Sequence, residues 1–69
     1  MTYSEKIGKN ISKIRKAKKL SQDDLATLAG VSKRQIIRIE AGENQSVKTI
    51  EKIANALLVT FKDLINDSG

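Results

Sequence analysis

Basic side chains gather on one face of the segment 33–39. Ile36 and Ile39 are three residues apart, the spacing of one helix face, and we expect both to enter the core. The opposite face then carries Lys33, Arg34, Ile37 and Arg38. Lysine and arginine are charged hydrogen-bond donors, so this face can bind phosphate or donate to the O6 and N7 atoms of guanine. The chemistry that these residues offer is anion binding.

Catalytic chemistry finds little support in the rest of the chain. The 69 residues include no His, Cys, Pro or Trp, which removes the commonest general base and the usual thiolate and imidazole metal ligands. Asp23 and Asp24 fit the first turn of a helix, and no phosphate loop or nucleophile motif is present. The 13 basic and 8 acidic residues give a net charge of +5, which favours an anionic partner. The sequence therefore predicts a non-enzymatic binding protein with no cofactor and no metal site.

Apolar residues recur at helical spacing through the chain, and no stretch alternates as a strand would. The stripes are Ile7, Ile11 and Ile14; Leu25, Leu28 and Ala29; Ile36 and Ile39; Val47, Ile50, Ile53, Ala54 and Leu57; and Phe61, Leu64 and Ile65. We predict an all-α fold with helices near 3–18, 22–29, 33–41, 47–57 and 61–66.

Hydroxyl residues precede the predicted helices at the N-cap position. Thr2, Ser21, Ser32 and Thr60 each have Glu, Asp or Gln three residues later, the pattern of a capping box, and Ser46 can cap the fourth helix alone. Gly30 and Gly42 stand where the second and third helices should end, because glycine adopts the left-handed cap conformation readily. Only Gly30-Val31-Ser32 separate these two helices. Such a corner is typical of a DNA-binding helix-turn-helix, although helical bundles also contain tight corners.

Several motifs follow one another along the chain: Ile14-Arg15, Leu20-Ser21-Gln22-Asp23-Asp24-Leu25-Ala26, Ala29-Gly30-Val31-Ser32, Ile36-x-x-Ile39-Glu40-x-Gly42 and Ile50-x-x-Ile53-Ala54-x-Ala56-Leu57. Together they resemble the lambda-repressor/Cro-type (XRE-like) helix-turn-helix family over residues 7–66. The resemblance implies a single compact five-helix domain, with its helix-turn-helix at about 22–41. It also implies a transcriptional regulator, most often a repressor or controller, that binds a near-palindromic operator in the major groove of double-stranded DNA as a homodimer. Lys19 and Leu58 depart from the pattern, because family members commonly carry glycine at both positions.

The resemblance also implies roles for single residues. Lys33, Arg34 and Arg38 match the positions that read bases, and Ile37 between them would contact a thymine methyl group or pack against its neighbours. The matching contacts to the DNA backbone come from Gln22, Ser32, Gln35, Asn44 and Lys48. For each of these the alternative is a solvated or capping residue. Lys9 and Asn10 are further candidates for phosphate contacts.

Two other sets have structural roles in this interpretation. Arg15 and Glu40 match positions that form a partly buried ion pair between the first and third helices. Leu58, Val59, Phe61 and Ile65 form an apolar group near the C-terminal helix, and we expect them to provide the dimer surface.

Two alternatives remain at this stage. The basic, amphipathic helix at 3–18 could lie on a membrane surface, but that leaves the rest of the chain unexplained. A protein–protein interaction module or antitoxin-like partner could use the same fold with weak or no specific DNA binding, which the basic face at 33, 34 and 38 disfavours. No signal peptide or membrane-span stretch is visible, so we expect a cytoplasmic, nucleoid-associated protein with no membrane partner and no small-molecule ligand.

Overall fold

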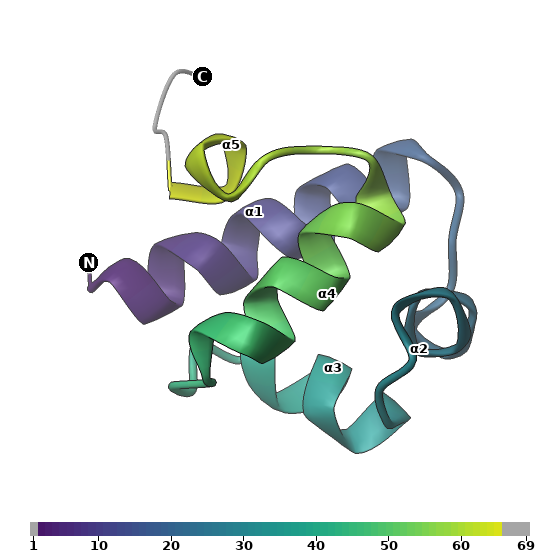
Figure 1. Cartoon of the computed structure of the whole chain (residues 1–69), viewed down its shortest axis with the longest axis horizontal. Helices are drawn as coiled ribbons and strands as arrows, with labels where there is room; N and C mark the ends of the chain where they lie inside the picture. Colours follow the sequence, from purple (N-terminus) through teal and green to yellow (C-terminus); the bar gives the residue numbers. More distant parts are fainter. Residues whose placement is uncertain (1, 66–69) are drawn as a thin grey trace.

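A computed structural model describes residues 2–65, which form five helices and no strand (Figure 1). The helices are α1 (Tyr3–Ala17), α2 (Gln22–Ala29), α3 (Lys33–Glu40), α4 (Val47–Leu57) and α5 (Phe61–Ile65). The expected all-α, five-helix fold is confirmed. Two predicted helices, 3–18 and 33–41, end one residue earlier than expected, and residue 66 of the predicted last helix lies outside the described residues.

Each helix begins where a side-chain oxygen can accept a hydrogen bond from an otherwise unpaired backbone N–H group. Thr2, Ser21 and Ser32 form complete capping boxes at the starts of α1, α2 and α3, and Ser46 accepts from the Thr49 N–H group at the start of α4. Before α5, the Thr60 N–H group donates to the Asp63 carboxylate over 2.9 Å. The shorter aspartate side chain therefore completes the box as glutamate would.

The first four helices end in one recurring motif, a pair of backbone bonds closed by a left-handed residue. At the end of α1, the Leu20 N–H group donates to the Arg15 carbonyl group. The Lys19 N–H group donates to the Lys16 carbonyl group, and the two bonds together form a Schellman motif. The left-handed residues of the four motifs are Lys19, Gly30, Gly42 and Leu58, with φ of 58°, 70°, 92° and 60°. Lys19 and Leu58 thus adopt the glycine conformation without being glycine.

The core is a single aliphatic cluster to which all five helices contribute. Its fully buried side chains are Ile11, Leu25, Ile36, Ile39, Ile53, Leu57 and Leu64. The prediction that Leu28 and Val47 belong to the buried stripes is wrong, because each side chain is 60% exposed. Leu28 lies at the edge of the buried face of α2, where Ala26 and Ala29 are covered instead, and Val47 occupies the first position of α4.

The packing leaves one face of α3 uncovered. α1 packs on α3 and α5, and α2 packs on α3 and α4. In Figure 1, α3 lies along the lower edge of the molecule, whereas α1 and α5 lie in its upper half. Within residues 2–65, no helix is both long and apolar enough to cross a membrane.

Candidate nucleic-acid interface

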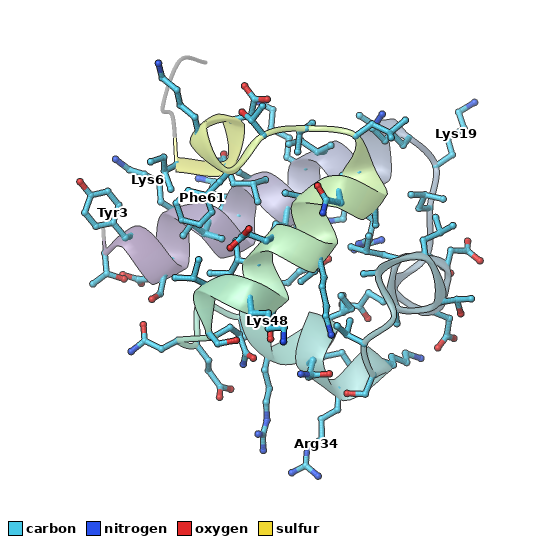
Figure 2. The ribbon with its side chains drawn as sticks, viewed as in Figure 1. Tyr3, Lys6, Lys19, Arg34, Lys48 and Phe61 are labelled. Carbon is cyan, nitrogen blue, oxygen red and sulfur yellow. The ribbon has the colours of Figure 1, made fainter. Side chains whose placement is uncertain are left out.

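The outward face of α3 carries the basic side chains that the sequence placed there. Lys33, Arg34 and Arg38 are exposed, and Ile37 is 46% exposed, while Ile36 and Ile39 are buried beneath them. Ile37 therefore shows an apolar surface within a basic face instead of joining the core. In Figure 2, Arg34 extends from the lower edge of the molecule, away from the other helices.

The N-terminus of α3 is open towards solvent beside these residues. The Ser32 hydroxyl group accepts from the Gln35 N–H group over 3.1 Å, and the Gln35 side-chain oxygen accepts from the Ser32 N–H group over 2.9 Å. The Gln35 amide NH2 group remains able to donate outward. The N–H groups of Lys33 and Arg34 lie in the first turn, where an α-helix supplies no internal acceptor. Such groups, together with the helix dipole, attract phosphate.

Lys33 has an ionic neighbour that reduces its freedom. Its Nζ atom lies 3.4 Å from the Asp23 carboxylate, and both side chains are largely exposed. An exposed pair of this kind is weak. Lys33 can therefore exchange this partner for a DNA group more readily than a buried lysine could.

A hydrogen-bond network behind α3 fixes its orientation. The Arg15 Nε atom donates to Glu40 Oε2 over 2.6 Å, and its Nη2 atom donates to Glu40 Oε1 over 3.0 Å. The Arg15 Nη1 atom donates to the Leu20 carbonyl group over 2.8 Å, and the Gln22 amide donates to Glu40 Oε1 over 3.1 Å. Hydrogen bonding to Glu40 raises the pKa of Arg15 above its ordinary value, although burial opposes the charge.

This network contains the ion pair expected between Arg15 and Glu40, and both side chains are about nine-tenths buried. It joins α1, the corner before α2, the start of α2 and the end of α3. Gln22 thus braces the helix that carries the basic face, and its second amide proton is left for another acceptor.

A close backbone contact complements the network. A Cβ atom built on Gly8 would lie 2.0 Å from the Ile39 carbonyl oxygen, so only glycine allows α1 to approach α3 this closely. Gly8 is buried in the middle of a helical stretch, where its flexibility otherwise costs stability. Its position is explained by the approach of α1 to the end of α3.

The loop after α3 lies beside the start of α1. The Ser4 hydroxyl group donates to the Asn44 side-chain oxygen, which leaves the Asn44 NH2 group able to donate to a phosphate. Lys48 is exposed in the first turn of α4 and, like Arg34, lies in the lower half of Figure 2.

The comparisons with known proteins agree with this geometry. The model of the helix-turn-helix family matches residues 11–64. The chain belongs to the helix-turn-helix family. Within this family, the chain resembles the lambda-repressor/Cro (XRE-like) members. The family is non-enzymatic.

Three relatives show how closely the family members agree. The HTH-type transcriptional repressor RghR of Bacillus subtilis is 37% identical over 67 residues, which cover 94% of this chain and 50% of RghR. The restriction-modification controller protein C.AhdI from Aeromonas hydrophila has a TM-score of 0.84 and 35% identity, over 88% of this chain and 94% of its own. SinR, crystallised in complex with DNA, has a TM-score of 0.81 and 35% identity, over 87% and 98%. The chain spans about half the length of the curated relatives that it matches.

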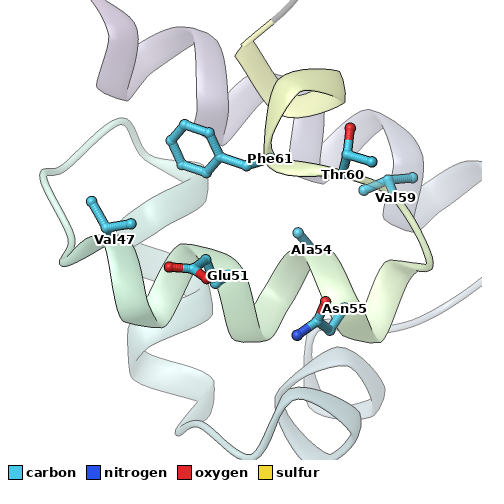
Figure 3. A pocket seen from close by; sticks show the side chains of 7 residues that line it. All are labelled: Val47, Glu51, Ala54, Asn55, Val59, Thr60 and Phe61. Carbon is cyan, nitrogen blue, oxygen red and sulfur yellow. The ribbon is translucent and has the colours of Figure 1, made fainter.

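The apolar group expected to form the dimer surface of this family member is only partly in contact with solvent. Leu58 is 85% exposed and Phe61 36% exposed, whereas Val59 and Ile65 are half-buried against the core. Val59 and Phe61 also line a groove of about 450 Å³ between α4 and α5, which Figure 3 shows from close by. The other lining residues are Val47, Glu51, Ala54, Asn55 and Thr60.

Several positioning residues of this helix-turn-helix domain were not identified from the sequence. Ser4, Gly8 and Asp23 contact residues 40, 31 and 10 positions away, and only the folded chain brings these partners together. Asn10 was considered for a phosphate contact, but its amide donates to the Leu64 carbonyl group over 2.6 Å and so holds α5 on α1. For Gly8 the sequence does contain a signal, because a glycine beside the apolar stripe of a helix can mark a close approach of another backbone.

Proposed function

We propose that residues 7–66 are a sequence-specific DNA-binding domain that regulates transcription, as a repressor or controller, and binds a near-palindromic operator as a homodimer. The observation that carries the proposal is the outward face of α3, with Lys33, Arg34, Ile37 and Arg38 exposed together over a rigidly held helix. Such a protein acts on the nucleoid, in the cytoplasm.

The names of the relatives support this function. RghR is named a transcriptional repressor, C.AhdI is a controller of a restriction-modification system, and SinR is a regulator crystallised with DNA. The C.AhdI and SinR chains are covered almost completely by this chain, so the likeness is not confined to a short motif.

In this proposal α3 enters the major groove. Arg34 and Arg38 donate to guanine, Lys33 leaves Asp23 to do the same, and Ile37 contacts a thymine methyl group. Phosphates are held by Gln22, Ser32, Gln35, Asn44 and Lys48. Gln35 lies in the first turn of α3, and the other four lie before or after this helix in the chain. Phosphate contacts fix the position of the domain, and the base contacts give specificity.

The two-fold dimer follows from the small size of this face. One helix reads only a few base pairs, so a second copy doubles the readout and predicts half-sites about 34 Å apart on one side of the duplex. The proposed interface comprises Leu58, Val59, Phe61 and Ile65 together with the α4–α5 groove. Leu58 is the best anchor, because a leucine that is 85% exposed gains most from being covered.

Selection of bound sequences from a random DNA pool tests the function, and two variants then separate specificity from affinity. Arg34→Ala should relax the preference at one base pair of each half-site, by about 1–3 kcal/mol of discrimination. Lys48→Ala should weaken all sequences alike and reduce the salt slope of binding by about 0.9. An equal loss on every sequence for both variants would show that α3 does not read bases. If no motif is enriched at either of two salt concentrations and binding depends steeply on salt, the domain binds DNA without sequence preference. If the domain binds no DNA at all, it is an interaction module instead.

Analytical ultracentrifugation of Leu58→Asp tests the dimer. Aspartate tolerates the left-handed conformation better than leucine, so the variant should fold and sediment as a monomer. Lys19→Asp is the matched control, because it changes another exposed left-handed residue and should leave the dimer intact. A Leu58→Asp protein that still sediments as a dimer would place the interface elsewhere.

A further inference from the structure

A second basic surface lies on α1, where only Lys9 is a candidate for a phosphate contact with the operator. Lys9, Lys13 and Lys16 are separated by four and three residues and are all exposed, so they form one stripe along the helix. Ile7, Ile11 and Arg15 are buried on the opposite side of α1. The stripe extends about 10 Å from Lys9 to Lys16, because an α-helix rises 1.5 Å per residue. We call these three residues the α1 lysine stripe.

The charge of this stripe is not neutralised by the fold. The chain has no acidic residue between Lys6 and Lys19, and Arg15 is already paired with Glu40. Within residues 2–65, none of the three stripe lysines forms an ion pair. The helix dipole favours Lys16 in the last turn, but it does not favour Lys9 or Lys13, and like charges at this spacing destabilise a helix. Helix stability therefore does not explain the stripe.

The stripe faces away from the proposed operator. α1 lies on the core side of α3, where Gly8 meets the Ile39 carbonyl group, whereas the operator face of α3 is its outward one. The stripe lies on the solvent-exposed side of α1. Lys6 and Lys19, which flank the stripe in the chain, lie in the upper half of Figure 2, whereas Arg34 lies at the lower edge. A duplex bound at α3 would leave the α1 lysine stripe uncovered.

We propose that the α1 lysine stripe binds the phosphate backbone of a second DNA duplex without sequence preference, so that one molecule joins two duplexes. This inference rests on the proposed function only in that α3 holds the first duplex. Lysines without aromatic or arginine anchors match a polyphosphate better than a protein surface, because protein interfaces are depleted of lysine and depend on such anchors. Insertion into a membrane is disfavoured, because the apolar side of α1 is buried in the core.

A bridging assay tests the proposal with two labelled duplexes, one carrying the selected operator and the other an unrelated sequence. Binding to the operator duplex alone is measured first, and energy transfer between the two duplexes second. The double variant Lys13→Gln, Lys16→Gln should keep operator affinity within about twofold but lose most of the bridging. The control Lys52→Gln, Lys62→Gln removes the same charge from exposed positions on α4 and α5 and should bridge as the unchanged protein does.

Salt dependence gives the expected size of the effect. With three phosphate contacts, affinity for the second duplex should fall about 40-fold between 50 and 200 mM salt, and with only Lys9 left it should fall about threefold. Equal bridging by the stripe variant and the control, or no bridging by the unchanged protein despite operator binding, would overturn the proposal. Binding to phosphatidylglycerol vesicles tests a membrane surface as the partner of the stripe. A stripe variant that loses vesicle binding but still bridges the two duplexes would also overturn the proposal. Failure to bind the operator duplex would count against the proposed function instead.

Discussion

Replacing Lys19 by glycine should stabilise the domain. The backbone of Lys19 is strained, with φ of 58°, and its exposed side chain contributes nothing to the core. Left-handed backbone costs an ordinary residue about 1–2 kcal/mol, whereas glycine adopts it freely but loses about 0.5–1 kcal/mol more chain entropy on folding. The net expectation is a gain of about 0.5–1 kcal/mol, or about 2–8 °C in Tm for a domain of this size.

Thermal unfolding followed by circular dichroism at 222 nm, with urea titration at low protein concentration, measures this gain. Lys18→Gly is the matched control, because the neighbouring residue has φ of −90° and should lose stability. Gly30→Ala measures the same balance of strain and chain entropy without a steric clash, since the added Cβ would meet no atom beyond its chain neighbours within 4 Å, and it should cost about 1 kcal/mol. If Lys19→Gly and Lys18→Gly destabilise the protein equally, the strain assigned to Lys19 is wrong.

Four other substitutions give further predictions. Gly8→Ala should lower the free energy of unfolding by about 3 kcal/mol or more, because its Cβ would meet the Ile39 carbonyl oxygen at 2.0 Å. A loss below about 1 kcal/mol in the same unfolding assay would contradict the close approach of α1 and α3. Arg15→Met and Glu40→Gln should each lower the free energy of unfolding by about 3 kcal/mol, because each leaves the other member of the ion pair buried without its partner. In a double-mutant cycle the loss of the double variant should be well below the sum of the two single losses. Additive losses would mean that the two residues are not coupled. The capping hydrogen bond lowers the pKa of Asp24, so its stabilisation is complete above the ordinary value of 3.8 and is lost as the pH falls through the lowered one. Asp24→Asn should therefore be less stable than the unchanged protein at pH 7 and equal to it in strong acid, and a gap that persists in acid would refute this cause.

Much of the fold could be predicted because the signals at helix ends are local. The capping hydroxyl groups contact N–H groups only three residues away, so the residues themselves fix where a helix begins. The left-handed positions were also visible as the two glycines and the two departures from the family pattern, Lys19 and Leu58. The outward face of α3 followed from the spacing of Ile36 and Ile39, because a helix has a fixed period.

The sequence by itself therefore determined the helices, their caps and the basic face of α3, all of which depend on residues a few positions apart. Only the tertiary structure decided that Leu28 is exposed, that Gly8 lies under Ile39, and that the Asn10 amide donates to the Leu64 carbonyl group. These outcomes depend on which helices meet and at what distance. Packing between segments tens of residues apart sets that distance, and helical periodicity alone carries no information about it.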